Sequence, residues 1–310
     1  MLELQAPAKI NLHLRITGLT EQGYHLLDTS FAYVDVCDVL HIEPAVELQV
    51  SCSDVMLNGE HNLVFRVLYA LRERYGIHQG LRVHIDKRLP SQAGLGGGSS
   101  DAASALMAAN NLWNLNLDLH ELCTFAAPFG ADIPCFLFGQ ASIASGIGDV
   151  LTPLTLPPEA LHVVLAHPGV GLSTAAVFQR FDREHALLAG QLTPQGAKAT
   201  MRAGLKGVSA RLSYAQLPVG ENALEVISEH MCPELARLLS AMRKEQTVSW
   251  MSGSGTACVA LCENSTQAEE MAERLTAEHL AVWTHAGTLL TGHPILHGDM
   301  LMGNRKRTGA

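Results

Sequence analysis

The chain has 310 residues, of which 47% are hydrophobic and 16% charged, and its 21 basic and 30 acidic residues give a net charge of −9. This composition excludes global disorder, which requires few apolar residues and much charge. The negative charge disfavours nucleic acid as a partner. The sequence contains no run of about 18 apolar residues, so no membrane-spanning helix and no membrane partner are expected.

The sequence also carries signals about the cellular compartment. The first twelve residues lack a basic leader followed by an apolar stretch, so we expect no secretory signal. The seven cysteines are scattered and never occur in CxxC spacing, which disfavours a disulfide framework or a zinc site and favours a reducing environment. We therefore expect a cytoplasmic protein, and no feature of the sequence indicates an obligate protein partner.

In the first half of the chain, polar and apolar residues alternate strictly from position 9 to position 16. This period predicts a β-strand with one buried face, made by Ile10, Leu12, Leu14 and Ile16. The opposite face is predicted to carry Lys9, Asn11, His13 and Arg15. Asn62 is expected to cap a helix that ends at Gly76. Further strands are predicted over 31–36, 46–52 and 81–85, and helices over 102–110 and 119–127.

Three of the 13 prolines fall within residues 153–158 and indicate a junction, so the predicted domains are 1–155 and 156–310. Beyond the junction, strands are predicted over 163–166, 256–261 and 281–285. Helices are predicted over 174–181, within 195–204 and 222–245, and over 266–278. The whole pattern predicts an α+β fold. The basic segment 303–307 is expected to belong to a short, solvated and disordered tail.

The segment from Gly94 to Ser100 has four glycines in five positions and runs directly into a predicted helix. Such a loop lets successive amides converge on an anion, and the helix start adds its positive dipole end. A flexible linker is the alternative, but a linker does not usually lead straight into a helix. A Walker A loop is excluded because the chain contains no Gly-Lys pair. A dinucleotide fingerprint fails because Ser99 or Asp101 takes the place of its last glycine. We therefore predict a phosphate loop of a third kind.

Three segments together resemble the GHMP small-molecule kinases, namely residues 7–12, 90–103 and 251–256. Three shorter segments, 23–26, 130–134 and 221–225, are similar to one subfamily whose substrate carries a cytidyl group. The resemblance covers nearly the whole chain in the right order. It implies a two-domain fold, with an N-terminal domain like ribosomal protein S5 domain 2 and a ferredoxin-like C-terminal domain. The active site would lie in the cleft between them.

The resemblance implies ATP-dependent phosphorylation of the 2-hydroxyl of a small cytidyl diphosphate substrate, a step of non-mevalonate isoprenoid precursor synthesis. It implies Asp132 as the general base and Lys9 as the orienting, charge-stabilising cation. The alternatives are that Asp132 only forms a turn and that Lys9 only faces water. A divalent cation, Mg²⁺ by expectation, would accompany ATP, and no protein ligand for it can be named.

The resemblance also implies a set of binding residues. The expected ATP-binding residues are Asn62, Lys87, Pro90, Ser91, Gln92, Ala93, Gly94, Leu95, Gly96, Gly97, Gly98, Ser99 and Ser100. The expected substrate-binding residues are Asn11, Tyr24, His25, Thr174, Phe178, Gly253 and Gly255. Within the second set, Tyr24 and His25 would read the cytosine and Phe178 would cover its opposite face. The alternatives are that Asn62 only caps its helix and that Phe178 only packs in the core.

Two other functions are open at this point. One is a different GHMP kinase that acts on homoserine or mevalonate, and the other is a non-catalytic metabolite sensor on the same fold. Segment 23–26 favours an acceptor that carries a base, which homoserine and mevalonate lack. The presence of both Lys9 and Asp132 argues against the sensor, because a sensor need not retain both.

Overall fold

The computed structural model describes residues 1–189, 215, 217–245 and 247–297. In this part of the chain one ten-stranded sheet has the order β3-β4-β2-β10-β7-β9-β8, with β1 and β5 paired to β2 and β6 paired to β5. The strands are β1 (Leu2–Leu19), β2 (His25–Ala45), β3 (Gln49–Cys52), β4 (Gly80–Asp86), β5 (Ser142–Ser145), β6 (Val150–Pro153), β7 (His162–His167), β8 (Ser249–Met251), β9 (Cys258–Cys262) and β10 (Trp283–Leu290). The predicted α+β class is confirmed.

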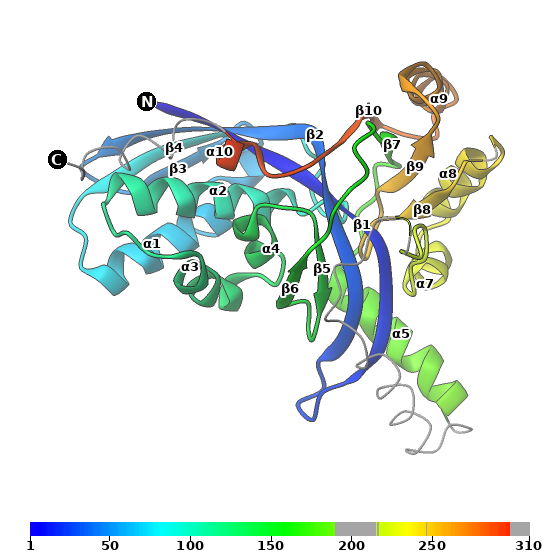
Figure 1. Cartoon of the computed structure of the whole chain (residues 1–310), viewed down its shortest axis with the longest axis horizontal. Helices are drawn as coiled ribbons and strands as arrows, with labels where there is room; N and C mark the ends of the chain where they lie inside the picture. The colour runs from blue at the N-terminus through cyan, green and yellow to red at the C-terminus, as the bar shows by residue number, and fades with distance from the viewer. Residues whose placement is uncertain (190–214, 216, 246, 298–310) are drawn as a thin grey trace.

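The helices cover the sheet in two groups, one in each half of the molecule, and the last short helix, α10, lies with the helices of the first half of the chain (Figure 1). They are α1 (Leu63–Tyr75), α2 (Gly97–Leu112), α3 (Leu119–Ala126), α4 (Ile133–Phe138), α5 (Thr174–Ala189), α7 (Glu225–Met231), α8 (Pro233–Arg243), α9 (Ser265–Ala277) and α10 (Pro294–His297), with short 3₁₀ turns η1 (Val55–Leu57) and η2 (Ala127–Phe129). Among the described residues, none of the helices has the length and apolar character needed to cross a membrane. All seven cysteines are free.

The antiparallel pair β1 and β2 runs between the two halves of the molecule (Figure 1). The strand predicted over 9–16 exists, but the prediction of a single buried face was wrong. Lys9, Asn11 and His13 are at most 3% exposed. Their side chains contact Asp132, Thr29 and Ser30, and segments of the C-terminal half bond to the backbone of the strand. The Asn11 amide donates a hydrogen bond to Ser252 Oγ (3.2 Å) and the Leu14 amide donates to the Glu221 carbonyl (2.8 Å).

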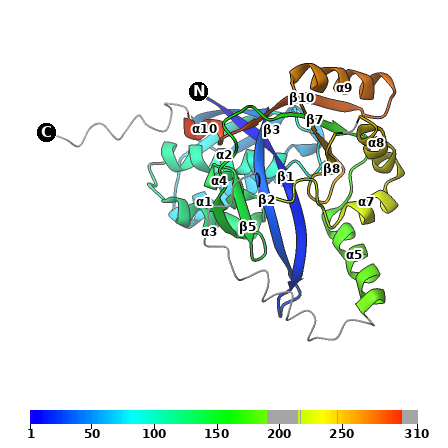
Figure 2. The ribbon, with the colours of Figure 1, turned by 45° about the vertical axis from the view of Figure 1, so that its right-hand side comes forward.

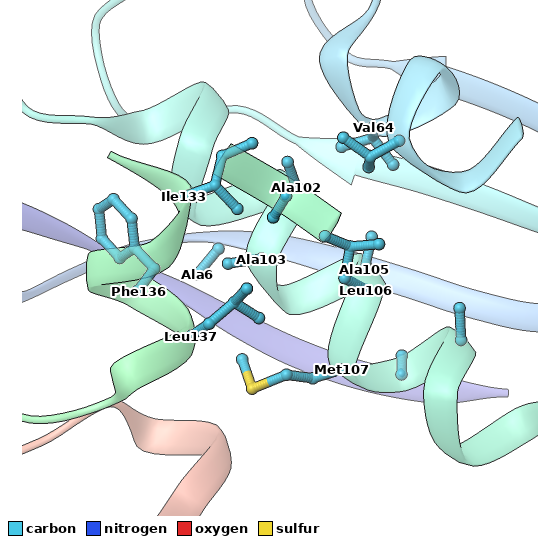
Figure 3. Packing of buried hydrophobic residues seen from close by; sticks show 14 of the residues in the cluster. Ala6, Val64, Ala102, Ala103, Ala105, Leu106, Met107, Ile133, Phe136 and Leu137 are labelled. Carbon is cyan, nitrogen blue, oxygen red and sulfur yellow. The ribbon is translucent and has the colours of Figure 1, made fainter. Parts of the chain in front are cut away.

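Local sequence signals explain α1 and α2. The Asn62 side chain accepts from the Val64 amide (2.8 Å), and α1 ends at Gly76, whose φ of 62° is left-handed, as predicted. Helix α2 is rich in alanine, so it packs closely against its neighbours. Figure 3 shows its alanines between Val64 of α1 and the side chains of Ile133 and Phe136 on α4. This packing places the start of α2 beside the start of α4.

Several elements differ from the prediction. Strand β3 begins at Gln49, and Val46, which the alternation assigned to a strand, is 88% exposed. Helix α4, the short strands β5, β6 and β8, and α10 were not predicted. The predicted helix within 195–204 and the predicted tail 303–307 lie outside the described residues.

Strand β10 connects the two halves through the sheet, as Figure 2 shows from the side. It pairs with β7 along its length and then with β2 through Leu289 and Leu290. Beside this junction Asp35 accepts hydrogen bonds from His285 Nε2 (2.7 Å) and from the amide and hydroxyl of Thr288. The pKa of Asp35 is lowered, because these hydrogen bonds together outweigh its partial burial. The boundary at 155/156 stays a prediction.

Candidate active site

The glycine loop ends at the first turn of α2. Gly96 is the N-cap with a φ of 70°, and no side chain caps this end of the helix. The first amides of a helix have no intrahelical partner, so those of Gly97, Gly98 and Ser99 are available to an anion. The loop is anchored on β1, where the Lys9 amide donates to the Leu95 carbonyl (2.9 Å).

A cavity of about 460 Å³ lies against this loop. Of the thirteen predicted ATP-binding residues, twelve line it: Asn62, Lys87 and every residue from Pro90 to Ser99. Ser100 does not line it, because its side chain is fully buried. Its hydroxyl has no hydrogen-bond partner among the residues that the structure describes. Met56 and Leu57 of η1 lie on the lining as well, and they give one part of the cavity an apolar surface. Asn62 lies on the lining while it also caps α1.

The glycines of the loop have different surroundings, which allows a direct test of phosphate binding. A Cβ added at Gly98 would meet no atom within 4 Å, whereas one at Gly96 would lie 2.9 Å from the Phe136 ring and 3.0 Å from Lys9 Cγ. A Cβ at Gly97 would point toward Lys87 Nζ at 3.2 Å. The cavity is therefore probed best at Gly98.

We expect Gly98→Val to weaken ATP binding about tenfold or more, since the added methyls occupy the space beside the first helical amides. Its thermal unfolding should be unchanged, because Gly98 has room and valine suits a helix better than glycine. Gly96→Ala is the matched variant, and it should lower the melting temperature because the left-handed backbone and Phe136 both oppose a Cβ. Calorimetric titration with ATP measures the first effect. Wild-type affinity in Gly98→Val would contradict the loop assignment.

The structure brings together the two predicted catalytic side chains, which are 123 positions apart in the sequence. Lys9 Nζ lies 3.7 Å from Asp132 Oδ2. The lysine side chain is 4% exposed and the aspartate side chain 39% exposed. Lys9 Nζ also donates to Asn11 Oδ1 (2.6 Å) and lies 5.4 Å from the centre of the Phe31 ring. The ammonium group is thus fixed from three sides beside an accessible carboxylate.

Asp132 stands at the N-cap of α4, a backbone position that agrees with the alternative of a turn residue. Its side chain, however, makes no capping hydrogen bond. Proline follows at the second helical position, Pro134, and needs no amide partner there. The carboxylate is therefore directed to Lys9 and to the cavity instead of to its own helix.

A second cavity of about 260 Å³ lies on the other side of this pair. Its lining includes the predicted substrate residues Asn11, Thr174, Phe178 and Gly253, together with Lys9 and Asp132. Asp132, Gly94, Ser99 and Thr174 line both cavities. The carboxylate thus stands at the border between a space lined by the glycine loop and a space of different chemistry.

The predicted acceptor residue Asn11 is already engaged by the protein. Its oxygen accepts from Lys9 Nζ, and its amide group donates to Thr29 Oγ1 (2.9 Å). The Thr29 hydroxyl in turn donates to the His13 carbonyl (2.5 Å). With both ends of the amide group occupied, the geometry indicates that Asn11 positions Lys9.

The predicted base-reading residues are only partly assembled. His25 Nε2 lies 2.7 Å from Asp182 Oδ1, and its ring centre is 4.6 Å from that of Phe178. Tyr24 is 63% exposed and lies outside the lining of the second cavity. Gly255 lies instead on a third cavity of about 270 Å³, beside Gln92 and Gly94.

Lys87 forms a buried charge network below the glycine loop. Its Nζ donates to Asp38 Oδ2 and to Asp101 Oδ2 (2.9 Å). Asp38 Oδ1 accepts from the amides of Arg88 (2.6 Å) and Leu89 (2.9 Å). Asp101 Oδ1 is buried, and in the described part of the chain it has no hydrogen-bond partner. Two carboxylates thus share one cation, and the network ties β2 and α2 to the segment that enters the loop.

Burial raises the pKa of the Asp101 carboxyl from 3.8 to about 7, since its effect outweighs the attraction of the Lys87 ammonium. The folded protein therefore keeps this proton between pH 4 and pH 7, while the unfolded chain releases it. The contribution of the Asp101 carboxyl to the free energy of unfolding is fully present below pH 4 and is lost as the pH rises to about 7. The raised pKa of Lys87 lies above this window.

We expect Asp101→Asn to remove this dependence. The free energy of unfolding of the wild type, minus that of the variant, should decrease between pH 4 and pH 7 and then stay level. Urea unfolding of both proteins at pH 5, 6, 7 and 8 measures the difference. Parallel stability curves would show that Asp101 titrates at its ordinary pKa in the folded protein.

Several residues that the sequence did not single out hold the site together. Ser252 Oγ donates to the Gly94 carbonyl (3.1 Å) and Ser254 Oγ is hydrogen-bonded to Thr174 Oγ1 (2.8 Å). Asn222 Nδ2 donates to the carbonyls of Met251 (2.7 Å) and Gly253 (2.8 Å). The sequence could have indicated these residues, because Asn222 lies inside segment 221–225 and Ser252 and Ser254 lie inside segment 251–256, both of which carry the family resemblance.

The comparisons with known proteins agree with this geometry. The family model for the GHMP kinases N terminal domain matches residues 62–140, and the model for the GHMP kinases C terminal matches residues 201–281. The chain belongs to the GHMP kinase family. Within that family, a 4-diphosphocytidyl-2-C-methyl-D-erythritol kinase of Polaromonas sp. (strain JS666) is 36% identical over 270 residues, which are 84% of this chain and 82% of the relative.

Solved structures support the same assignment. A crystal structure of a 4-(cytidine 5'-diphospho)-2C-methyl-D-erythritol kinase has a TM-score of 0.71 and 32% identity, and the match covers 93% of this chain and 99% of that one. The mevalonate kinase of L. major, solved in complex with R-mevalonate, has a TM-score of 0.65 and 18% identity over 94% of this chain and 96% of its own. The second match shows the fold alone.

Proposed function

We propose that this protein transfers the terminal phosphoryl group of ATP to the 2-hydroxyl of 4-diphosphocytidyl-2-C-methyl-D-erythritol, giving the 2-phosphate and ADP. The observation that carries the proposal is the position of Asp132 on the border between the two cavities, with Lys9 beside it in the lining of the second. The relatives that cover most of the chain supply the identity of the acceptor. The product would serve non-mevalonate isoprenoid precursor synthesis.

The glycine-loop cavity would hold ATP. The amides at the start of α2 donate to the phosphates, and the dipole of a 16-residue helix favours their charge. Met56 and Leu57 offer apolar surface to the purine. This orientation directs the terminal phosphorus toward Gly94 and Ser99, the two loop residues that also line the second cavity.

The second cavity would hold the acceptor with its hydroxyl against Asp132. The carboxylate takes the hydroxyl proton as the oxygen attacks phosphorus, and the bond to ADP breaks in line. Lys9 Nζ orients the carboxylate and offsets the charge that grows between the two oxygens. Asn11 and the ring of Phe31 hold Lys9 in place for both tasks.

A divalent cation, Mg²⁺ by proposal, fits this border. In the described residues no group of three or more His, Cys, Asp or Glu could hold a metal ion. Mg²⁺ that is bound with a nucleotide needs only one or two protein oxygens, since phosphates and waters complete its shell. Ser99 lines both cavities, and its hydroxyl would provide such an oxygen, while the Asp132 carboxylate faces the acceptor hydroxyl. When bound, the ion neutralises charge on the transferred phosphoryl group.

A coupled ADP-release assay tests the proposal. Purified protein with ATP and Mg²⁺ is offered 4-diphosphocytidyl-2-C-methyl-D-erythritol, homoserine and mevalonate in parallel. We expect release only with the first acceptor, and mass spectrometry should show that its mass increases by one phosphoryl group. Release with homoserine or mevalonate would favour the first alternative, and tight ATP binding without turnover on any acceptor would favour the sensor.

The proposal extends to location and partners. A cytoplasmic location is supported by seven cysteines that are all free. The proposed partners are small molecules only, namely ATP and the cytidyl diphosphate substrate.

A further inference from the structure

The start of β2 lies near α5 (Figure 2), and aromatic and charged side chains of the two elements form a cluster there. Of these side chains, Phe178 lines the second cavity. The cluster joins residues more than 150 positions apart. His25 begins β2, and its side chain is 15% exposed. Phe178 and Phe181 of α5 approach its ring with centres at 4.6 Å and 6.2 Å. Asp182 of the same helix faces its Nε2 at 2.7 Å.

These contacts fix the plane of the imidazole and distinguish its two nitrogens. The carboxylate of Asp182 can only accept a hydrogen bond, so Nε2 must carry a proton and donate it. In the neutral ring Nδ1 is then a bare acceptor. Within the described part of the chain Nδ1 has no hydrogen-bond partner, and it is not buried. Phe178, which holds one side of the ring, also lines the second cavity.

We propose that Asp182 is a positioning residue that makes His25 selective for cytosine over uracil. The inference rests on the proposed function, since it concerns the base of that acceptor. Cytosine presents an amino group at C4, which donates, whereas uracil presents an oxygen there, which accepts. An Nδ1 held as an acceptor pairs with the first and leaves the second without a donor. By fixing the tautomer of His25, the Asp182 carboxylate allows the site to discriminate between two bases of equal shape.

The test compares two amide replacements on α5. In Asp182→Asn the amide can present either its oxygen or its amino group to Nε2, so both tautomers of His25 are held. Glu184→Gln removes the same charge two residues further on, where the carboxylate pairs with Arg180. For each protein, kcat/KM is measured with the cytidyl acceptor and with its uridyl analogue. We expect the ratio of the two values to fall about tenfold in Asp182→Asn and to stay at the wild-type value in Glu184→Gln.

The ratio separates positioning from mere support of the fold. A structural role would lower kcat/KM for both acceptors together, so an unchanged ratio in Asp182→Asn would overturn the proposal. An equal change in Glu184→Gln would overturn it too, since it would reflect net charge alone. The KM for ATP should be the same in all three proteins.

A spectroscopic measurement keeps the inference independent of turnover. In protein labelled with ¹⁵N-histidine, the His25 signals, assigned with a His25→Gln variant, should show the proton on Nε2. The population with the proton on Nδ1 should rise in Asp182→Asn. An equal population of this tautomer in both proteins would refute the role of Asp182. A wild-type protein that is inactive on both the cytidyl and the uridyl acceptor would refute the proposed function instead.

Discussion

Replacing Asp132 by asparagine is expected to lower kcat about 10²- to 10⁴-fold, the usual contribution of a general base. The substitution keeps the shape of the side chain and removes its ability to take a proton. Helix α4 should remain intact, because the Asp132 side chain makes no capping hydrogen bond there. The affinity for ATP should stay within a few-fold of the wild type, since the amides that would hold the phosphates are unchanged. Steady-state kinetics and calorimetric titration measure the two quantities.

The matched control is Asp118→Asn. Asp118 is also an N-cap, but its side chain caps α3 by accepting from the Glu121 amide (2.8 Å), and asparagine caps equally well. It lies outside the lining of both cavities. We expect wild-type kcat in this variant. Normal turnover in Asp132→Asn would exclude Asp132 as the base, and a matching loss in Asp118→Asn would show that helix capping is what the assay detects.

The second large effect concerns stability. Lys87→Met should lower the free energy of unfolding by about 3–5 kcal/mol, because it leaves Asp38 and Asp101 buried side by side without their shared cation. For a chain of this size the melting temperature should fall by at least about 5 °C. Differential scanning calorimetry measures the change. Asp38 would retain its two backbone amides, so the loss comes from the ammonium group alone.

Arg88→Met provides the comparison for that measurement. Arg88 follows Lys87 directly and carries the same charge, but its side chain is exposed and forms no ion pair in the described part of the chain. Exposed substitutions of this kind usually change stability by about 0.5 kcal/mol or less. Equal melting temperatures for the two variants would mean that the buried network adds nothing to stability.

Local signals were sufficient for much of the fold. Helix α1 was predicted with both ends, because Asn62 and Gly76 act on backbone groups within their own turn. The position of the glycine loop at the start of α2 was predicted correctly, since a run of glycines directly before a helix is visible in the sequence itself. Helix α4 was missed, because six residues are too few to show a period.

The site depended on contacts between distant segments. The alternation over 9–16 indicates a strand but not what contacts its polar side, where Asp132 lies 123 positions from Lys9. It also does not show that Ser252, 241 positions away, bonds to the backbone of Asn11. The meeting of Lys9 and Asp132 followed from the family resemblance alone. Asp182 carried no signal at all, since only the placement of α5 against β2 brings it to His25. The catalytic and binding roles themselves stay predictions.

The hydroxyl of Ser252 bonds to both of the segments that line the two cavities. It accepts a hydrogen bond from the Asn11 amide of β1 and donates one to the Gly94 carbonyl of the glycine loop. The Ser252 side chain thus links Asn11, which lines the second cavity, to Gly94, which lines both cavities. If ATP and the acceptor occupy the two cavities as proposed, a shift of Asn11 or of Gly94 on binding would pass to the other through this hydroxyl.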